Sequence, residues 1–172
     1  MKTYILLFRG INVGGRNILP MKALTLLLEQ QGFTSVRSYI QSGNIVLQAS
    51  TRPGDAIGSA IETQFGFRPE IMVLDRRELE AAAGNNPYAS ADGKSVHFYF
   101  ADRVPAPDPD RLAALASGTE RFALDGKVFY LYAPDGIGRS RLVAGLEKCL
   151  GVPATGRNLN TVNKLLEMAR DS

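Results

Sequence analysis

A repeat within the chain is the feature that most restricts its fold. Residues 42–47 (SGNIVL) match residues 125–130 (DGKVFY), 83 positions later, and residues 61–67 (IETQFGF) match residues 146–152 (LEKCLGV), 85 positions later. In each copy the first stretch joins turn residues to an apolar strand, and the second ends a helical pattern with glycine. Two copies of one supersecondary unit therefore account for most of the 172 residues.

The first copy has the element order strand, helix, strand, strand, helix, strand. Residues 4–8 form an unbroken apolar run, which is typical of a strand buried on both faces. Apolar residues then recur at helical spacing from Met21 until Gly32, after Pro20 at the start of the pattern. This order predicts a ferredoxin-like βαββαβ unit, in which two helices cover one face of a four-stranded antiparallel sheet.

The same order begins again at residues 96–100 but ends differently. Residues 154–161 (ATGRNLNT) occupy the place of the fourth strand and lack its apolar pattern. We therefore expect an α+β protein of two tandem ferredoxin-like units with antiparallel sheets covered by helices, the second unit lacking a regular fourth strand. The expected boundaries are residues 1–76 for the first unit, 77–93 for a connector and 94–172 for the second unit with its C-terminal helix.

The chain is too poor in histidine and cysteine for most metal sites or for a disulfide framework. It has one of each, His97 and Cys149, and Cys149 lies on an apolar helical stripe that predicts a core position. We expect no metal and no cofactor. The apolar run at residues 4–8 is too short for a signal sequence, and no run approaches the length of a membrane span. We expect a cytoplasmic protein that does not associate with membranes.

Charge is unevenly distributed along the chain. The formal net charge is +3, but residues 1–47 carry +4, residues 48–110 carry −4 and residues 111–172 carry +3. This distribution is consistent with an anion-facing surface built from both ends of the chain. An ordinary solvated surface gives the same distribution, so charge alone does not separate the two alternatives.

Four motifs, spread over the whole chain, resemble those of the bacterial domain-of-unknown-function family 1697. They are residues 9–15 (RGINVGG), 39–44 (YIQSGN), 134–142 (PDGIGRSRL) and 155–161 (TGRNLNT). The resemblance implies a cytoplasmic α+β protein and attaches no reaction to it. Two positions depart from the family pattern, which more often has Lys at Arg141 and Trp at Leu159.

The glycine-rich loop at residues 10–17 is the first candidate site. It joins a strand to a helix, where free backbone N–H groups and the positive helix end favour an anion. Lys22 and two arginines would add full charges. The spacing G-x-x-x-G-G matches neither the dinucleotide fingerprint nor a Walker A loop. In the alternative interpretation the glycines only permit a tight bend, and Asn12 and Asn17 tie the loop to itself. The expected ligand-binding residues in and beside the loop are Arg9, Gly10, Asn12, Gly14, Gly15 and Arg16.

Two further segments precede helices and carry arginine. Ser140 is a candidate N-cap beside Arg141, and this turn is either a second anion site or, as we favour, a simple cap. Asn158 is a candidate cap beside Arg157, which would either close over a ligand in the first loop or bridge the two halves through backbone carbonyls. Arg141, Arg157, Asn158 and the hairpin residue Asn44 complete the predicted ligand-binding set.

Catalysis has little support in the sequence. Ser42 lacks a G-x-S-x-G context and a nearby base, since the only histidine lies in an expected strand, so a turn role is favoured. No pair of titratable groups stands out as acid and base, although Asn44, Asp125 or Asp135 would serve as polar participants.

The predicted function is binding of a phosphate-bearing or other anionic ligand, either a small molecule such as a nucleotide or a nucleic acid. Two alternatives stay open: a small-molecule enzyme acting on an anionic substrate, and a protein-interaction module that uses an exposed strand edge in the second unit. Tyrosines on the second sheet, among them Tyr99 and Tyr130, would stack on bases or, as we favour, pack the two halves together.

Overall fold

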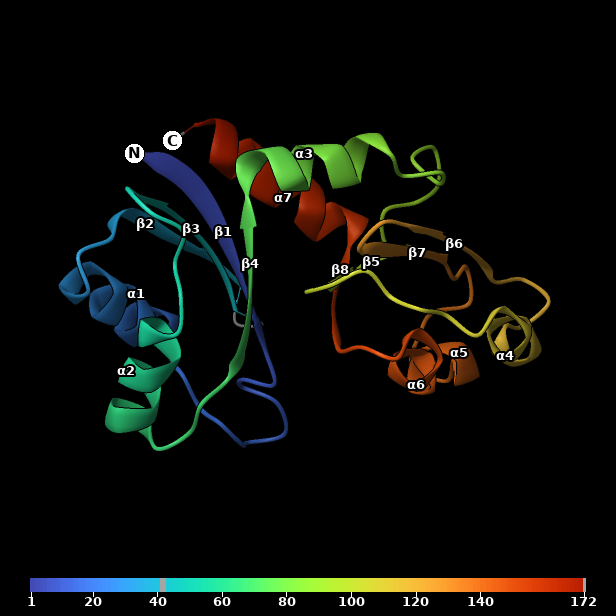
Figure 1. The fold of residues 1–172 in the computed structure, drawn as a ribbon, viewed down its shortest axis with the longest axis horizontal. Helices are drawn as coiled ribbons and strands as arrows, with labels where there is room; N and C mark the ends of the chain where they lie inside the picture. Colours follow the sequence, from blue (N-terminus) through green and yellow to red (C-terminus); the bar gives the residue numbers. More distant parts are fainter. Residues whose placement is uncertain (41–42, 172) are drawn as a thin grey trace. The chain divides into compact units, whose positions relative to one another are not determined.

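The computed structural model describes residues 1–40 and 43–171, and this part of the chain forms a mixed α+β fold with two four-stranded antiparallel sheets (Figure 1). The chain divides into two compact units. The first is Met1–Glu80 together with the C-terminal residues from Lys164 onward, and the second is Ala81–Asn163. An α+β fold with antiparallel sheets was predicted, and it is confirmed.

The first unit has its sheet strands in the order β2-β3-β1-β4. The elements are β1 (Lys2–Arg9), α1 (Met21–Gln30), β2 (Thr34–Tyr39), β3 (Asn44–Ala49), α2 (Ala56–Phe65) and β4 (Glu70–Asp75), followed by α3 (Arg76–Gly84). In Figure 1, α1 and α2 lie on the same face of this sheet.

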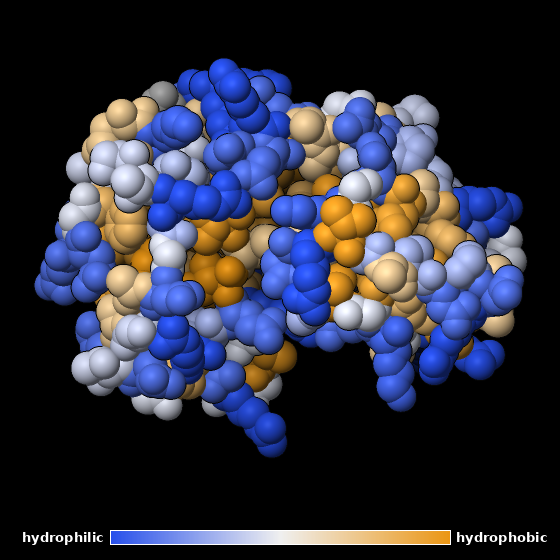
Figure 2. Space-filling model, in the orientation of Figure 1, coloured by the Kyte–Doolittle hydropathy of each residue, from blue (hydrophilic) through white to orange (hydrophobic). Residues whose placement is uncertain are grey.

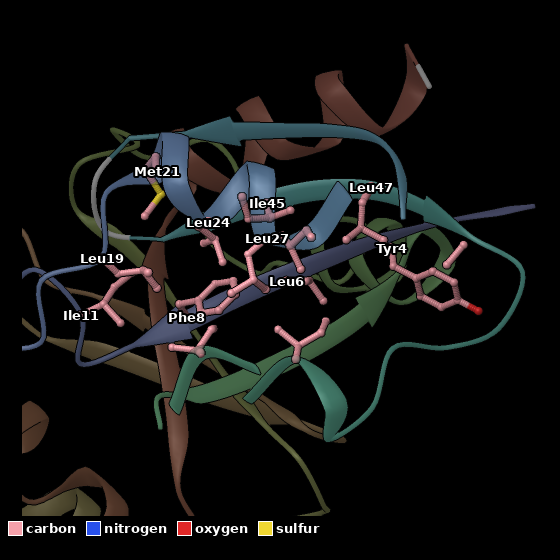
Figure 3. Packing of buried hydrophobic residues seen from close by; sticks show 14 residues of the cluster. Tyr4, Leu6, Phe8, Ile11, Leu19, Met21, Leu24, Leu27, Ile45 and Leu47 are labelled. Carbon is pink, nitrogen blue, oxygen red and sulfur yellow. The ribbon is translucent and has the colours of Figure 1, made fainter. Parts of the chain in front are cut away.

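Strand β1 is the centre of the first unit because every residue from Tyr4 to Phe8 is buried. It pairs with β3 on one side and with β4 on the other. Side chains alternate between the two faces of a strand, so Tyr4, Leu6 and Phe8 share one face, where they belong to the hydrophobic cluster that α1 and α2 complete (Figure 3). The predicted buried strand is confirmed.

Helix α1 packs on the sheet through the apolar stripe predicted from its sequence. Met21, Leu24, Leu27 and Leu28 are buried, and each leucine contributes about 1.5–3 kcal/mol by leaving water. Pro20 stands at the N-cap position, and Gly32, in a left-handed conformation, follows the helix. Pro20 and Gly32 thus mark the two ends of α1, as the sequence predicts.

The second unit repeats the sheet order of the first, with strands β6-β7-β5-β8. If the strands of each unit are numbered along the chain, both sheets have the order 2-3-1-4. The elements are β5 (Val96–Ala101), α4 (Pro109–Leu115), β6 (Arg121–Asp125), β7 (Val128–Tyr132), α5 (Arg141–Ala144), α6 (Leu146–Leu150), β8 (Ala154–Asn158) and α7 (Leu159–Arg170).

The prediction that the second unit lacks a regular fourth strand is wrong. Strand β8 pairs with β5 in an antiparallel register that runs from His97 opposite Asn158 to Ala101 opposite Ala154. It therefore occupies the edge that the protein-interaction alternative required to be open. The missing apolar pattern has a physical reason: Gly156 lies opposite Tyr99, and the tyrosine ring occupies the space that a side chain would fill.

A substitution at Gly156 tests this packing. A Cβ added there would lie 2.6 Å from Cε1 of Tyr99, so Gly156→Ala forces the ring or the strand to move. We expect the free energy of unfolding to fall by about 1–3 kcal/mol, measured by urea denaturation. Gly118→Ala is the matched control, because a Cβ there meets nothing within 4 Å. Equal stability of the two variants would contradict the close contact.

Candidate functional site

The glycine-rich loop between β1 and α1 is a miniature hairpin with a two-residue turn. Val13 pairs with Arg16, and the Arg16 N–H donates to the Val13 carbonyl at 3.0 Å. Gly14 and Gly15 both have positive φ, 58° and 72°, as a type I′ turn requires. The glycines are therefore needed to make the turn at the tip of the loop.

Two asparagines hold the base of the loop. The side chain of Asn12 donates from Nδ2 to the Leu19 carbonyl at 2.9 Å and accepts the Leu19 N–H on Oδ1 at 2.7 Å. Asn17 donates from Nδ2 to the Gly10 carbonyl at 3.0 Å. These hydrogen bonds agree with the alternative interpretation, in which the asparagines tie the loop to itself. A contact of Asn12 or Gly10 with a ligand stays a prediction.

Buried side chains anchor the loop to the core. Ile11 and Leu19 are buried members of the first unit's hydrophobic cluster, and Figure 3 shows them beside Phe8 at one end of it. The loop is therefore fixed at its base by apolar contacts and hydrogen bonds, while residues 13–18 are exposed. Such a loop presents its tip to solvent without much conformational freedom to lose on binding.

The cations beside the loop differ in their surroundings. Arg9, at the end of β1, donates from Nη1 to Oε2 of Glu70 at 3.0 Å, and both side chains are exposed. Exposed pairs of this kind contribute only about 0–1 kcal/mol, but Glu70 would still compete with an anionic ligand for Arg9. Arg16 and Lys22 are exposed, and no ion pair to either is present among the described residues.

The β2–β3 hairpin lies against the base of the same loop. The Phe8 N–H donates to the Gly43 carbonyl at 2.8 Å, and a Cβ added at Gly43 would lie 2.7 Å from Cδ1 of Ile11. Asn44 is fully buried and donates from Nδ2 to the Tyr39 carbonyl at 3.0 Å, so its side chain closes the hairpin. Of the predicted turn, Ser42 lies outside the described residues.

The structure thus brings together two of the motifs that the sequence keeps 24 residues apart, residues 9–15 and 39–44. Sequence reasoning identified both motifs but not their contact. The only local signal was Gly43, because a glycine in a turn also permits close approach of a neighbour.

The second candidate turn is a helix cap. Ser140 accepts the Val143 N–H on Oγ at 3.2 Å and donates to Oε2 of Glu120 at 2.6 Å. Glu120 is buried, and its Oε1 accepts the Ser117 N–H at 2.8 Å. The favoured capping role of Ser140 is confirmed, and sequence reasoning missed the carboxylate beneath it. Arg141 lies exposed in α5, and its contact with a ligand stays a prediction.

The third candidate segment is partly structural. Asn158 accepts the Thr161 N–H on Oδ1 at 2.9 Å, so it caps α7 as predicted. Arg157 lies in β8 and donates from Nη1 to the Gly156 carbonyl at 2.8 Å, and its burial lowers the pKa of the guanidinium to about 10. Arg157 belongs to the second unit and the glycine loop to the first, and their joint action on a ligand stays a prediction.

Tyr99 and Tyr130 of the second sheet are buried. Tyr130 donates its hydroxyl to the Ala82 carbonyl at 2.6 Å, and burial raises the pKa of both Tyr99 and Tyr130 to about 12. Burial also lowers the pKa of His97, which favours its neutral form. Side chains so placed pack the sheet, and stacking of a base on the half-buried aromatic rings of this sheet stays a prediction. Cys149 is also buried, as predicted.

The described residues hold no cluster of three or more His, Cys, Asp or Glu side chains placed to bind a metal ion. Within residues 1–40 and 43–171, no helix is both long enough and apolar enough to cross a membrane.

Comparison with known proteins confirms the family that the motifs predicted. Residues 1–130 match the family described as a protein of unknown function (DUF1697), and the chain belongs to this family. Among solved structures, it is similar to the conserved bacterial protein SP0830 from Streptococcus pneumoniae, with 27% sequence identity, a TM-score of 0.67 and 98% of each chain covered. A search of curated proteins finds no match.

Removing the Asn12 side chain tests its role in the loop. Asn12→Ala leaves the N–H and the carbonyl of buried Leu19 without these partners, so we expect a loss of about 1–3 kcal/mol in unfolding free energy and faster hydrogen exchange at the Leu19 amide. Asn12→Asp is the comparison variant, because it keeps the acceptor for the amide but sets a carboxylate oxygen, in place of the donor, against the Leu19 carbonyl. Unchanged exchange at Leu19 in Asn12→Ala would contradict this role.

Proposed function

We propose that the loop between β1 and α1 binds the phosphate or another anionic group of a ligand. The observation that carries this proposal is Arg16, an exposed cation held at the end of a type I′ turn whose base is fixed in the core. A guanidinium meets phosphate or carboxylate with two parallel N–H donors, and the fixed backbone of the turn loses little entropy on binding.

The start of α1 supports the same proposal. The first N–H groups of a helix have no intrahelical partner, and here the first turn has neither a side-chain cap nor an acidic residue. Lys22 lies in this first turn, and the chain has no acidic residue before Glu29. A helix end of this kind favours a nearby anion by about 0.3–1 kcal/mol when exposed. In the proposed site this modest contribution would add to the charge of Arg16.

The finer description of the fold is also a proposal. We propose that the two sheets belong to tandem ferredoxin-like units related by duplication, since their strands follow the same order and the sequence repeat aligns their hairpins. In a duplicated pair, the longer connection between β1 and α1 is a difference between copies. Differences between copies are natural places to look for function, because connecting loops carry binding residues more often than the elements they join.

We also propose that the protein acts in the cytoplasm. Its single cysteine, Cys149, is buried and unpaired, which suits a reducing compartment.

Substitution of Arg16 tests the anion site. We expect Arg16→Ala to weaken binding of inorganic tripolyphosphate, followed by isothermal titration calorimetry, by about tenfold, and Arg16→Lys to weaken it less because the charge remains. Binding by the unmodified protein should also weaken as salt is added.

Arg111→Ala is the matched control, because Arg111 is an exposed arginine on α4 of the second unit. Both variants should unfold at the same denaturant concentration as the unmodified protein. Equal loss of affinity in the two variants would mean that net charge, and not this loop, attracts the anion.

A further inference from the structure

The side chains at the tip of the loop are divided between two tasks. The polar ones, Asn12 and Asn17, form hydrogen bonds inside the loop. Those left on its outside are one cation, Arg16, and two aliphatic residues, Val13 and Ile18, which are 66% and 55% exposed. Single exposed apolar side chains are common on protein surfaces, but here two of them share a short loop with a cation, which suits a ligand that is both apolar and anionic.

The pairing across the turn places the cation and an apolar side chain together. Val13 and Arg16 are directly opposite each other in the miniature hairpin, so their side chains project from the same face. Ile18 lies two residues after Arg16, in the irregular segment that leads to α1. In Figure 2, the surface where Figure 1 shows this loop has hydrophobic groups beside hydrophilic ones. The loop therefore presents a charged and an apolar surface side by side.

The neighbouring hairpin adds a third exposed apolar residue. Ile40 is 50% exposed and has a φ of 51°, a conformation that costs a β-branched residue energy. Its carbonyl accepts the Gly43 N–H at 3.4 Å, and Gly43 lies against Ile11 at the base of the loop. Ile40 is thus a further exposed apolar side chain of the first unit, in the hairpin that contacts the base of the loop.

We infer that this surface binds a nucleotide unit, with a phosphate at Arg16 and the face of the base against Val13 and Ile18. The inference rests on the proposed anion site and specifies its ligand. A nucleobase has an apolar face attached, through a sugar, to a phosphate, and aliphatic side chains gain from covering that face. A sugar phosphate would instead set hydroxyl groups against Val13 and Ile18, whose side chains have no hydrogen-bonding groups.

The same chemistry occurs in a free nucleotide and in single-stranded nucleic acid. The loop side chains that would have to read the edges of a base, Asn12 and Asn17, are engaged within the loop. Binding should therefore tolerate any base, as it does where bases are held by their faces alone.

The experiment compares ligands with and without bases at similar charge. One arm sets adenosine diphosphate against inorganic pyrophosphate. The other sets an oligothymidylate of about ten nucleotides against an abasic deoxyribose-phosphate strand of the same length. We expect the base to improve affinity about fivefold in at least one arm, and the arm in which it does so identifies the source of the nucleotide.

Variants assign this preference to the loop. Val13→Ser combined with Ile18→Ser should abolish the advantage of the base. The affinity for the base-free ligands should stay unchanged, and this unchanged affinity is the control that the loop still folds. Val104→Ser, at an equally exposed valine (67%) in the second unit, is the matched control and should keep the advantage.

Three outcomes would overturn the inference. Equal affinity for ligands with and without a base would mean that the loop binds anions but does not recognise a nucleotide. An advantage of the base that survives Val13→Ser and Ile18→Ser would place the base elsewhere. Binding to none of these anions would overturn the proposed function as well.

Discussion

Burial of β1 on both faces is the constraint on which the first unit depends. Five consecutive apolar residues, Tyr4 to Phe8, are removed from water, and the strand is hydrogen-bonded to a neighbour along each edge. A strand so enclosed has a defined end, and the chain leaves it at Arg9 and Gly10. The loop begins there, and Ile11 returns at once to the core. The position of the exposed turn therefore follows from the packing of the strand before it.

Much of the fold was predictable because it follows from local patterns. The run at residues 4–8, the stripe of α1 and the caps at Ser140 and Asn158 each depend on residues close together in the chain. Strand β8 was not predictable in this way. Its weak pattern depends on Gly156 meeting Tyr99, which is 57 residues earlier, and no local rule shows that a ring will occupy the place of a side chain.

The candidate site shows the same division. The glycines and asparagines of the loop were recognised from their spacing, and the hydrogen bonds of Asn12 agree with the self-tying alternative, while its contact with a ligand stays a prediction. The pairing of Arg9 with Glu70 and the contact of Gly43 with Ile11 join distant segments, so the sequence alone did not reveal them. Exposure of Val13 and Ile18 was also hidden, because apolar residues in a sequence are ordinarily assigned to the core.

The division of the chain into units has a consequence for the order in which it folds. The last residues, from Lys164 onward, belong to the first unit, where the Arg37 guanidinium donates to the Met168 carbonyl. On the ribosome, residues 1–80 emerge early. The last part of α7, which belongs to the same unit, is synthesised only after the whole of the second unit. The first unit therefore stays incomplete until the residues from Lys164 onward have been synthesised, although most of its core lies within residues 1–80.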